Sequence, residues 1–194
     1  MSVDGKIEAL NTSLNDMVSA FAEEEDGRAE IHVGIVTFGG SADLHQDVVP
    51  AGETSRVPLV ATGMTPMGAA FEIAQKLIED TEKIPSRAYT PAIILLSDGQ
   101  PNDNWQESLD RLLSSPRAKK AQRFALGIGE DADAEVLKRF LDNPEAKVYG
   151  ASDARQIKSF FRWVTMSVST RSRSINPNVS QVDELLPSDL DELL

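Results

Sequence analysis

Hydrophobic residues along the chain follow two different periods, which separate predicted helices from predicted strands. Between Lys6 and Phe21 apolar residues recur every three or four positions, and this spacing predicts an amphipathic helix. Helical spacing also predicts helices over 66–83, 105–113, 133–141 and 153–168. Apolar or β-branched runs predict strands over 31–38, 92–97 and 123–128, with shorter strands expected over 43–49 and 147–149.

The order of these elements predicts an α/β fold. Strands that alternate with helices are typical of a doubly wound, Rossmann-like, mostly parallel sheet. The segment 43–49 is more polar and is followed by Pro50, which favours one antiparallel strand at the edge of that sheet. We expect this domain to span residues 1–169.

The composition changes after Ser169. Residues 170–194 have the composition of a linker followed by an acidic, leucine-rich tail that ends in DELLPSDLDELL. Acidic segments with few aromatic residues are usually disordered, and a short docking helix is the alternative. We therefore expect residues 170–194 to lie outside the folded domain.

Charge and composition narrow the classes of function. The formal net charge of -12 argues against nucleic-acid binding, which normally requires a clustered basic surface. The absence of cysteine excludes disulfides, thiolate metal sites and a cysteine nucleophile. No apolar run is long enough to cross a membrane and the first residues do not resemble a signal peptide, so we expect a cytoplasmic protein without a membrane partner.

Two oxygen-bearing loops carry the candidate chemistry. Ser97-Asp98-Gly99 follows the most apolar predicted strand, and Gly63–Gly68 opens a predicted helix with Pro66 at a first helical position. Ligands of open α/β sheets bind at the carboxyl ends of the strands, where both loops are expected. A carboxylate with a hydroxyl suits a hard cation such as Mg²⁺. Alternatively, Asp98 caps a turn or the next helix, and Thr65 caps the helix before Pro66.

The order of elements and the two loops together resemble the von Willebrand factor A domain. The pattern is a helix, the strand Ile-x-Val-x-Ile-Val-Thr-Phe, an edge strand, the loop Gly-x-Thr-x-x-Gly, and a strand followed by Ser-Asp-Gly-x-Pro-x-Asp. The resemblance covers about Asp4 to Val168, and among family members the chain looks closest to small bacterial tellurite-resistance proteins of the TerY type.

This resemblance implies a binding function and no enzymatic activity. It implies a Rossmann-like sheet of order 3-2-1-4-5-6 with a metal-ion-dependent adhesion site at its carboxyl edge. Thr65 and Asp98 match the site's threonine and aspartate, which hold Mg²⁺ or Mn²⁺ while a protein partner's carboxylate completes the metal's shell. Met64, Gly99 and Gln100 would line the partner contact. A bacterial stress-response role is also implied.

The sequence departs from the family at its beginning. Family members have a strand and an Asp-x-Ser-x-Ser loop before the first helix, and neither is found between Met1 and that helix. We expect a truncated start, with a strand supplied in trans or a rearrangement as the alternatives. Without that strand, 31–38 and 92–97 would leave unpaired edges, so the chain would self-associate, swap an element or close its sheet directly. Metal binding would then be weak or absent.

Two other functions remain as alternatives. The first is a phosphate-handling, metal-dependent hydrolase that uses Asp98, although no phosphate-binding loop such as G-x-x-x-x-G-K-[ST] is present. His32 and His45 fall in predicted strands, so neither is an obvious general base. The second is a structural scaffold whose acidic tail, Asp183–Leu194, binds the partner.

Overall fold

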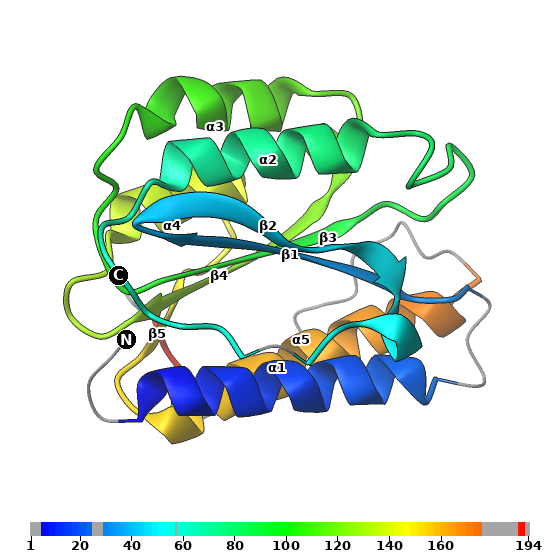
Figure 1. Cartoon of the computed structure of the whole chain (residues 1–194), viewed down its shortest axis with the longest axis horizontal. Coiled ribbons are helices and arrows are strands. Elements are labelled where there is room, and N and C mark those ends of the chain that lie inside the picture. The colour runs from blue at the N-terminus through cyan, green and yellow to red at the C-terminus, as the bar shows by residue number, and fades with distance from the viewer. Residues whose placement is uncertain (1–4, 25–28, 57, 176–189, 193–194) are drawn as a thin grey trace.

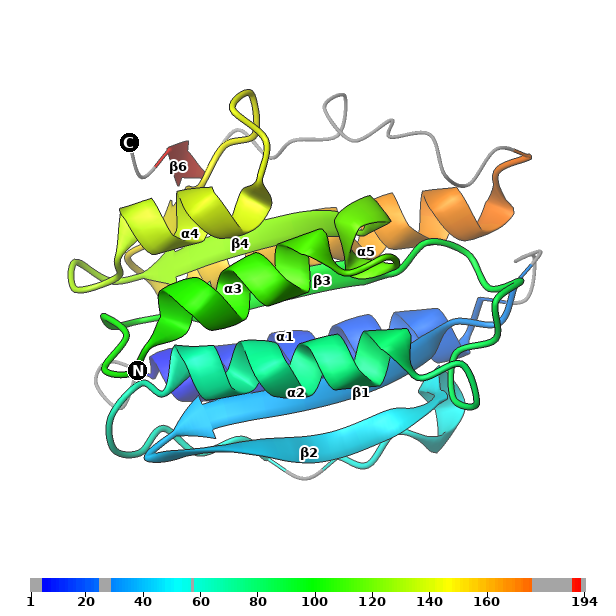
Figure 2. The same ribbon diagram turned by 90° about the horizontal axis from the view of Figure 1, so that it is seen from above.

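The computed structural model describes residues 5–24, 29–56, 58–175 and 190–192. Helices cover both faces of a central layer of strands (Figures 1 and 2). One face carries α1 (Lys6–Ala22) and α5 (Ala154–Arg173), and the other carries α2 (Met67–Glu79), α3 (Trp105–Ser114) and α4 (Ala134–Leu141). None of the described helices combines the length and the apolarity that a membrane span requires.

The strands form two sheets within the described residues. The strands β1 (His32–Gly39) and β2 (Ser41–Pro50) form an antiparallel pair. The strands β3 (Ala92–Ser97), β4 (Gln122–Ile128) and β5 (Tyr149–Ala151) are parallel neighbours. The predicted α/β, Rossmann-like, mostly parallel fold with an antiparallel edge strand is therefore confirmed, but β1 and β3 are not hydrogen-bonded to each other.

Hydrophobic residues form one core on each side of the strands. The core beneath α1 and α5 contains Trp163, whose ring meets Phe124 and Tyr149 edge-on at centroid distances of 5.0 and 5.3 Å. The core beneath α2, α3 and α4 contains Phe71 and Phe140, stacked at 6.1 Å. Alternate side chains of a strand point to opposite faces, so the continuous apolar sequence of β3 contributes to both cores.

Several element boundaries differ from the predicted ones. Helix α2 ends at Glu79 and not at Lys83, because Asp80 Oδ1 accepts hydrogen bonds from the amides of Glu82 and Lys83 and forms a turn. Strand β5 lies two residues later than the predicted 147–149, where it pairs with the carboxyl end of β4. Two single-turn 3₁₀ helices, Ala51–Glu53 and Ala118–Lys120, were not predicted.

The last helix continues beyond the predicted end at Val168. Helix α5 runs to Arg173, and Arg171 near its end donates hydrogen bonds to Thr90 O and Gln122 Oε1. Most of the predicted tail lies outside the described residues. Its described part includes the two-residue strand β6 (Asp191–Glu192), which pairs antiparallel with β5 at the sheet edge.

Candidate metal and partner-binding site

The structure brings the two candidate loops together at the carboxyl edge of the strands. Thr65 lies just before α2, and Asp98 follows the last residue of β3. A Cβ atom placed on Gly99 would lie 3.1 Å from Thr65 Oγ1. The threonine hydroxyl therefore packs directly against the residue after Asp98, and both Thr65 and Asp98 are half-buried.

Hydrogen bonds between the loops fix this arrangement. The carbonyl oxygen of Thr65 accepts hydrogen bonds from the amides of Met67 at 2.9 Å and Asn102 at 3.1 Å. Within the Asp98 loop, the Ser97 hydroxyl donates to Gly99 O at 3.1 Å. The backbone on either side of Asp98 is therefore held in place by its own turn and by the Thr65 loop.

Asp103 provides the strongest connection between the loops. Its two carboxylate oxygens accept hydrogen bonds from Gly68 N at 2.9 Å and Ala69 N at 3.0 Å, the first free amides of α2. Gly68 must be a glycine here, because a Cβ would lie 2.9 Å from Trp105 Cα and 3.0 Å from Asp103 Oδ2. An anion at a helix N-terminus is also favoured by the helix dipole.

The loop after β1 closes the third side of the site. Gly40 N donates to Met64 O at 2.7 Å, and the Thr62 hydroxyl donates to Gly39 O at 3.1 Å. Gly63 has a φ of +62° and approaches so closely that a Cβ would lie 2.6 Å from Gly40 Cα. Three loops, following β1, preceding α2 and following β3, thus meet at one edge.

The helix-capping alternatives do not describe this structure. Pro66, and not Thr65, is the N-cap residue of α2, one position before the first helical residue, and Asp103 supplies the side-chain acceptor for the helix. Helix α3 begins after Asn104, so Asp98 does not cap it.

The predicted partner-contact residues lie on the surface of this edge. Met64 is 67% exposed and its sulfur accepts a hydrogen bond from Asn102 Nδ2 at 3.7 Å. Gln100 is exposed, and Gly99 is half-buried beside Thr65. An exposed apolar side chain on the same edge as a half-buried carboxylate and hydroxyl is an arrangement that a protein partner can contact.

The donor set suits a hard divalent cation but is small. The described residues contain no cluster of three or more His, Cys, Asp or Glu side chains able to hold a metal. Thr65 and Asp98 offer a hydroxyl and a carboxylate, oxygen ligands of the kind that Mg²⁺ and Mn²⁺ prefer. In octahedral coordination the other positions would be left to water and to a partner.

Sequence reasoning missed the roles of Asp103 and Asn102. Both stand in the same Ser-Asp-Gly-x-Pro-x-Asp pattern as Asp98, which was the available signal. Asp103 lies two residues before α3, so local rules associate it with that helix. Its actual partner, Gly68, is 35 positions away along the chain.

Comparison with known proteins identifies the family. The model of the von Willebrand factor type A domain matches residues 1–163, and the chain belongs to this family. Domains of this family are generally protein-interaction modules without enzymatic activity. No curated protein matches the chain.

Solved structures share the fold at low identity. A von Willebrand factor type A protein from Catenulispora acidiphila is 18% identical, with a TM-score of 0.58 over 88% of this chain and 40% of that one. Proximal thread matrix protein 1 from the mussel byssus, with a zinc-occupied adhesion motif, is 15% identical, with a TM-score of 0.59 over 83% and 42%. BatB from Bacteroides thetaiotaomicron is 14% identical, with a TM-score of 0.58 over 87% and 89%. The chain thus spans about two fifths of the length of the first two.

Proposed function

We propose that the chain is a protein-binding module that captures a carboxylate of its partner through a divalent cation, Mg²⁺ or Mn²⁺, held by Thr65 and Asp98. The observation that carries this proposal is the packing of the Thr65 hydroxyl against Gly99. A Cβ atom placed on Gly99 would lie 3.1 Å from Thr65 Oγ1. Hydrogen bonds from Asn102 N to Thr65 O and from Gly68 N to the Asp103 carboxylate hold the two loops together independently of any ion. The pair is therefore preorganised to offer oxygens to one cation.

Each residue at this edge has a defined part in such an interaction. The Asp98 carboxylate supplies negative charge to the cation, and the Thr65 hydroxyl supplies a neutral oxygen. Met64 and Gln100 are exposed, so they would contact the partner around the metal-bound carboxylate. Gly99 leaves room for Thr65 and for the approaching partner because it has no side chain.

The cation would be held weakly by this chain alone. Two protein oxygens leave most of an octahedral shell to water, and Mg²⁺ gives up its water reluctantly. The resemblance assigns the remaining ligands to a loop that follows a further strand, and the described residues show no such strand between β1 and β3. The separation of β1 from β3 in the described residues supports that assignment.

The experiment is a titration of the chain with Mn²⁺, with and without acetate as a carboxylate probe. Paramagnetic broadening of amide resonances in NMR spectra should begin at residues 64–65 and 98–100, at millimolar Mn²⁺. Acetate should strengthen this broadening, since it occupies an open coordination position. Asp98→Ala should abolish it, whereas Asp131→Ala, at an exposed loop position, should leave it unchanged.

Two results would contradict the proposal. Broadening that is centred elsewhere and survives Asp98→Ala would show that the cation binds at another site. Submillimolar affinity for Mg²⁺ in calorimetry would contradict the incomplete ligand set.

Other predicted functions remain predictions. A role in bacterial stress or tellurite resistance rests on the TerY-type resemblance, and the cytoplasmic location rests on the sequence pattern alone. The alternative of a metal-dependent hydrolase gains no support from the contacts around Asp98. Phosphatase and ATPase assays with Mg²⁺ should give no activity that Asp98→Ala removes.

A further inference from the structure

The outer edge of β5 holds residues 190–192, near the end of the chain. Strand β6 pairs there antiparallel, with Glu192 opposite Tyr149 and Asp191 opposite Gly150. Leu190, just before β6, is half-buried and packs against the core beneath α1 and α5. Main-chain hydrogen bonds and one apolar side chain therefore seat this acidic segment on the edge of the sheet.

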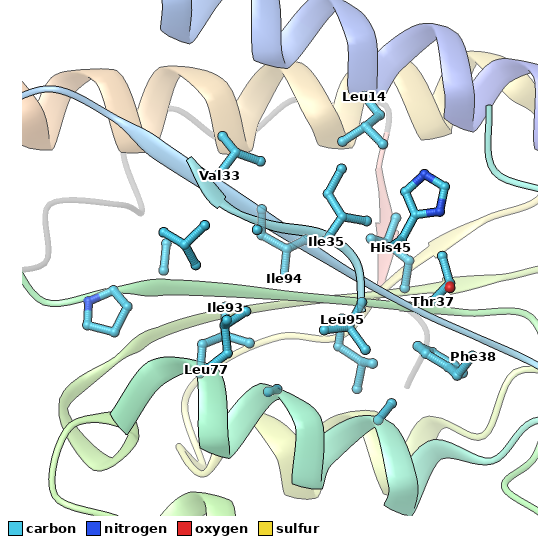
Figure 3. A pocket seen from close by; sticks show the side chains of 18 of the residues that line it. Leu14, Val33, Ile35, Thr37, Phe38, His45, Leu77, Ile93, Ile94 and Leu95 are labelled. Atoms are coloured by element: carbon cyan, nitrogen blue, oxygen red, sulfur yellow. The ribbon is translucent and has the colours of Figure 1, made fainter. Parts of the chain in front are cut away.

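The other strand edges among the described residues do not suit an acidic segment. Strands β1 and β3 face each other across a cavity of about 1020 Å³ between the two sheets. Figure 3 shows Val33, Ile35 and Ile94 among its apolar lining, and carboxylates are costly to bury in such surroundings. The strand at the outer edge of the other sheet, β2, carries Asp43 and Asp47, which repel further negative charge. Strand β5 has no charged residue.

The sequence pattern that is seated on β5 occurs twice in the tail. Residues 190–194 are Leu-Asp-Glu-Leu-Leu and residues 182–186 are Val-Asp-Glu-Leu-Leu, so the two segments differ only in the first residue. Both first residues, Val182 and Leu190, are apolar and suit the half-buried position against the core. We call residues 182–186 the first tail unit and residues 190–194 the second tail unit.

Chain length lets only the second tail unit reach its own β5. Helix α5 begins just after β5, and its 20 residues carry the chain away by about 30 Å. Figure 2 shows β6 at the end of the molecule opposite to the last turn of α5. From Ile175, an extended chain spans ~50 Å to Asp191 but only ~26 Å to Asp183. The first tail unit therefore falls short of the edge that the second one occupies.

The second tail unit holds this edge by attachment more than by strength. A tethered segment has an effective concentration on the order of millimolar, which favours it over any free competitor. Its strand pairing, however, comprises only the two residues of β6, and short pairings open readily. Each opening exposes the N–H and C=O groups of β5, which can then pair with another extended segment.

We propose that the outer edge of β5 docks the first tail unit of a second copy of the chain, in the place that residues 190–192 occupy within one copy. Two copies exchange their units reciprocally, so the dimer has two equivalent contacts. Lys147 is exposed and stands two residues before Tyr149, so its charge favours an acidic strand at this edge. The interaction uses main-chain hydrogen bonds, needs no cation and is independent of the proposed metal site.

The test measures self-association of full-length variants by sedimentation in EDTA. Leu190→Lys places a charge against the core and should release the second tail unit. With that competitor lost, the dissociation constant of the dimer should fall at least about tenfold relative to the unmodified chain. Val182→Lys in addition disables the first tail unit and should restore the monomer. Val182→Lys alone is the matched control and should sediment like the unmodified chain.

A peptide probe tests the docking edge separately from dimer formation. A fluorescent peptide of residues 181–187 should bind the Leu190→Lys variant at least about tenfold more tightly than the unmodified chain, by fluorescence anisotropy in EDTA. The same peptide with Asp183→Pro lacks a backbone donor and should bind at least about tenfold more weakly. In the Leu190→Lys variant, the unaltered peptide should slow hydrogen exchange at amides of residues 149–151. Circular dichroism checks that the variants are folded.

Three results would overturn the proposal. The first is a Leu190→Lys variant that stays monomeric and binds no peptide at about 100 µM. The second is a double variant that associates as strongly as Leu190→Lys. The third is association that protects amides of β1 and β3 and leaves those of β5 unchanged. Because EDTA removes divalent cations, none of these results depends on the metal site.

Discussion

At the scale of single residues, Asp103 decides whether the candidate site has a fixed shape. Its two carboxylate oxygens bind the first free amides of α2, and no residue of α2's own loop does so. The side chain of Asp103, in the loop after β3, therefore holds Thr65 in its position beside Asp98. Asp103 is a positioning residue for the site.

Replacing Asp103 should cost stability in a graded way. Asp103→Ala removes both acceptors and should lower the free energy of unfolding by about 1–2 kcal/mol, the range for losing a helix cap. Asp103→Asn keeps one acceptor oxygen and should cost about half as much. Urea denaturation measures both, with Asp131→Ala as the exposed control. An Asp103→Ala variant as stable as the unmodified chain would show that the two hydrogen bonds do not stabilise the loops.

Gly40 and Gly63 offer a second test at this scale, because they differ in only one respect. Both have positive φ, +77° and +62°, but a Cβ on Gly40 would make only an ordinary van der Waals contact, 3.9 Å from Gly63 Cα, whereas one on Gly63 would lie 2.6 Å from Gly40 Cα. Gly40→Ala should therefore cost about 1 kcal/mol for the left-handed backbone, and Gly63→Ala more than about 2 kcal/mol. Chemical denaturation of the two variants shows which one loses more free energy of unfolding. The reverse order would show that the loops after β1 and before α2 are not in close contact.

At the scale of elements, the ends of α1 and α5 are joined by an ion pair. Arg173 Nε and Nη2 donate to the two carboxylate oxygens of Glu24 at 2.7 and 2.8 Å. The hydrogen bonds from Arg173 hold the pKa of the Glu24 carboxyl below its ordinary value of 4.5. The positive charge of Arg173 at the last turn of α5 is also favoured by the helix dipole.

This ion pair gives stability a pH dependence whose sign is fixed. A carboxyl group whose pKa is lowered by folding stabilises the protein at pH values above its unfolded-state pKa. That stability is lost as the pH falls through its folded-state pKa. Glu24→Gln should therefore lower the unfolding free energy by about 0.5–1 kcal/mol at pH 7, a small effect because Arg173 is exposed to solvent. The difference from the unmodified chain should shrink below pH 4.5. Urea denaturation at several pH values measures it, with Glu23→Gln as the exposed control, and a difference that persists at low pH would contradict the assignment.

Elements with complete local signals were predicted well, and those set by distant contacts were not. The strand at 92–97 was predicted residue for residue because Pro91 and Asp98-Gly99 bound an uninterrupted apolar run. The extension of α5 beyond Val168 depends on Arg171 reaching Thr90 and Gln122, which no local pattern reveals. The same limit applies to the site: its loops were predicted from motifs, but the hydrogen bond from Gly68 N to the Asp103 carboxylate was not.

At the scale of the whole molecule, the dominant feature is a core that is well packed on both sides and open in the middle. Periodicity alone predicted the strands on either side, and only the family resemblance predicted a discontinuity between them. The structure adds that the two sheets remain apart and that the space between them is apolar. A protein interior normally has few voids larger than a water molecule, so this region should respond to added volume unlike the rest of the core.

Two alanine-to-leucine substitutions compare the open and closed regions directly. Ala125 of β4 is 1% exposed in a filled core, so Ala125→Leu should lower the unfolding free energy by about 1–3 kcal/mol through overpacking. Ala74 lines the cavity between β1 and β3, so Ala74→Leu should be neutral or should stabilise by about 0.5–2 kcal/mol, as cavity-filling changes do. Guanidinium denaturation measures the unfolding free energy of both variants. The comparison requires that this free energy depends on denaturant concentration with the same slope in each. If Ala74→Leu destabilises as much as Ala125→Leu, the cavity is closed in solution, and β1 and β3 pair directly with each other.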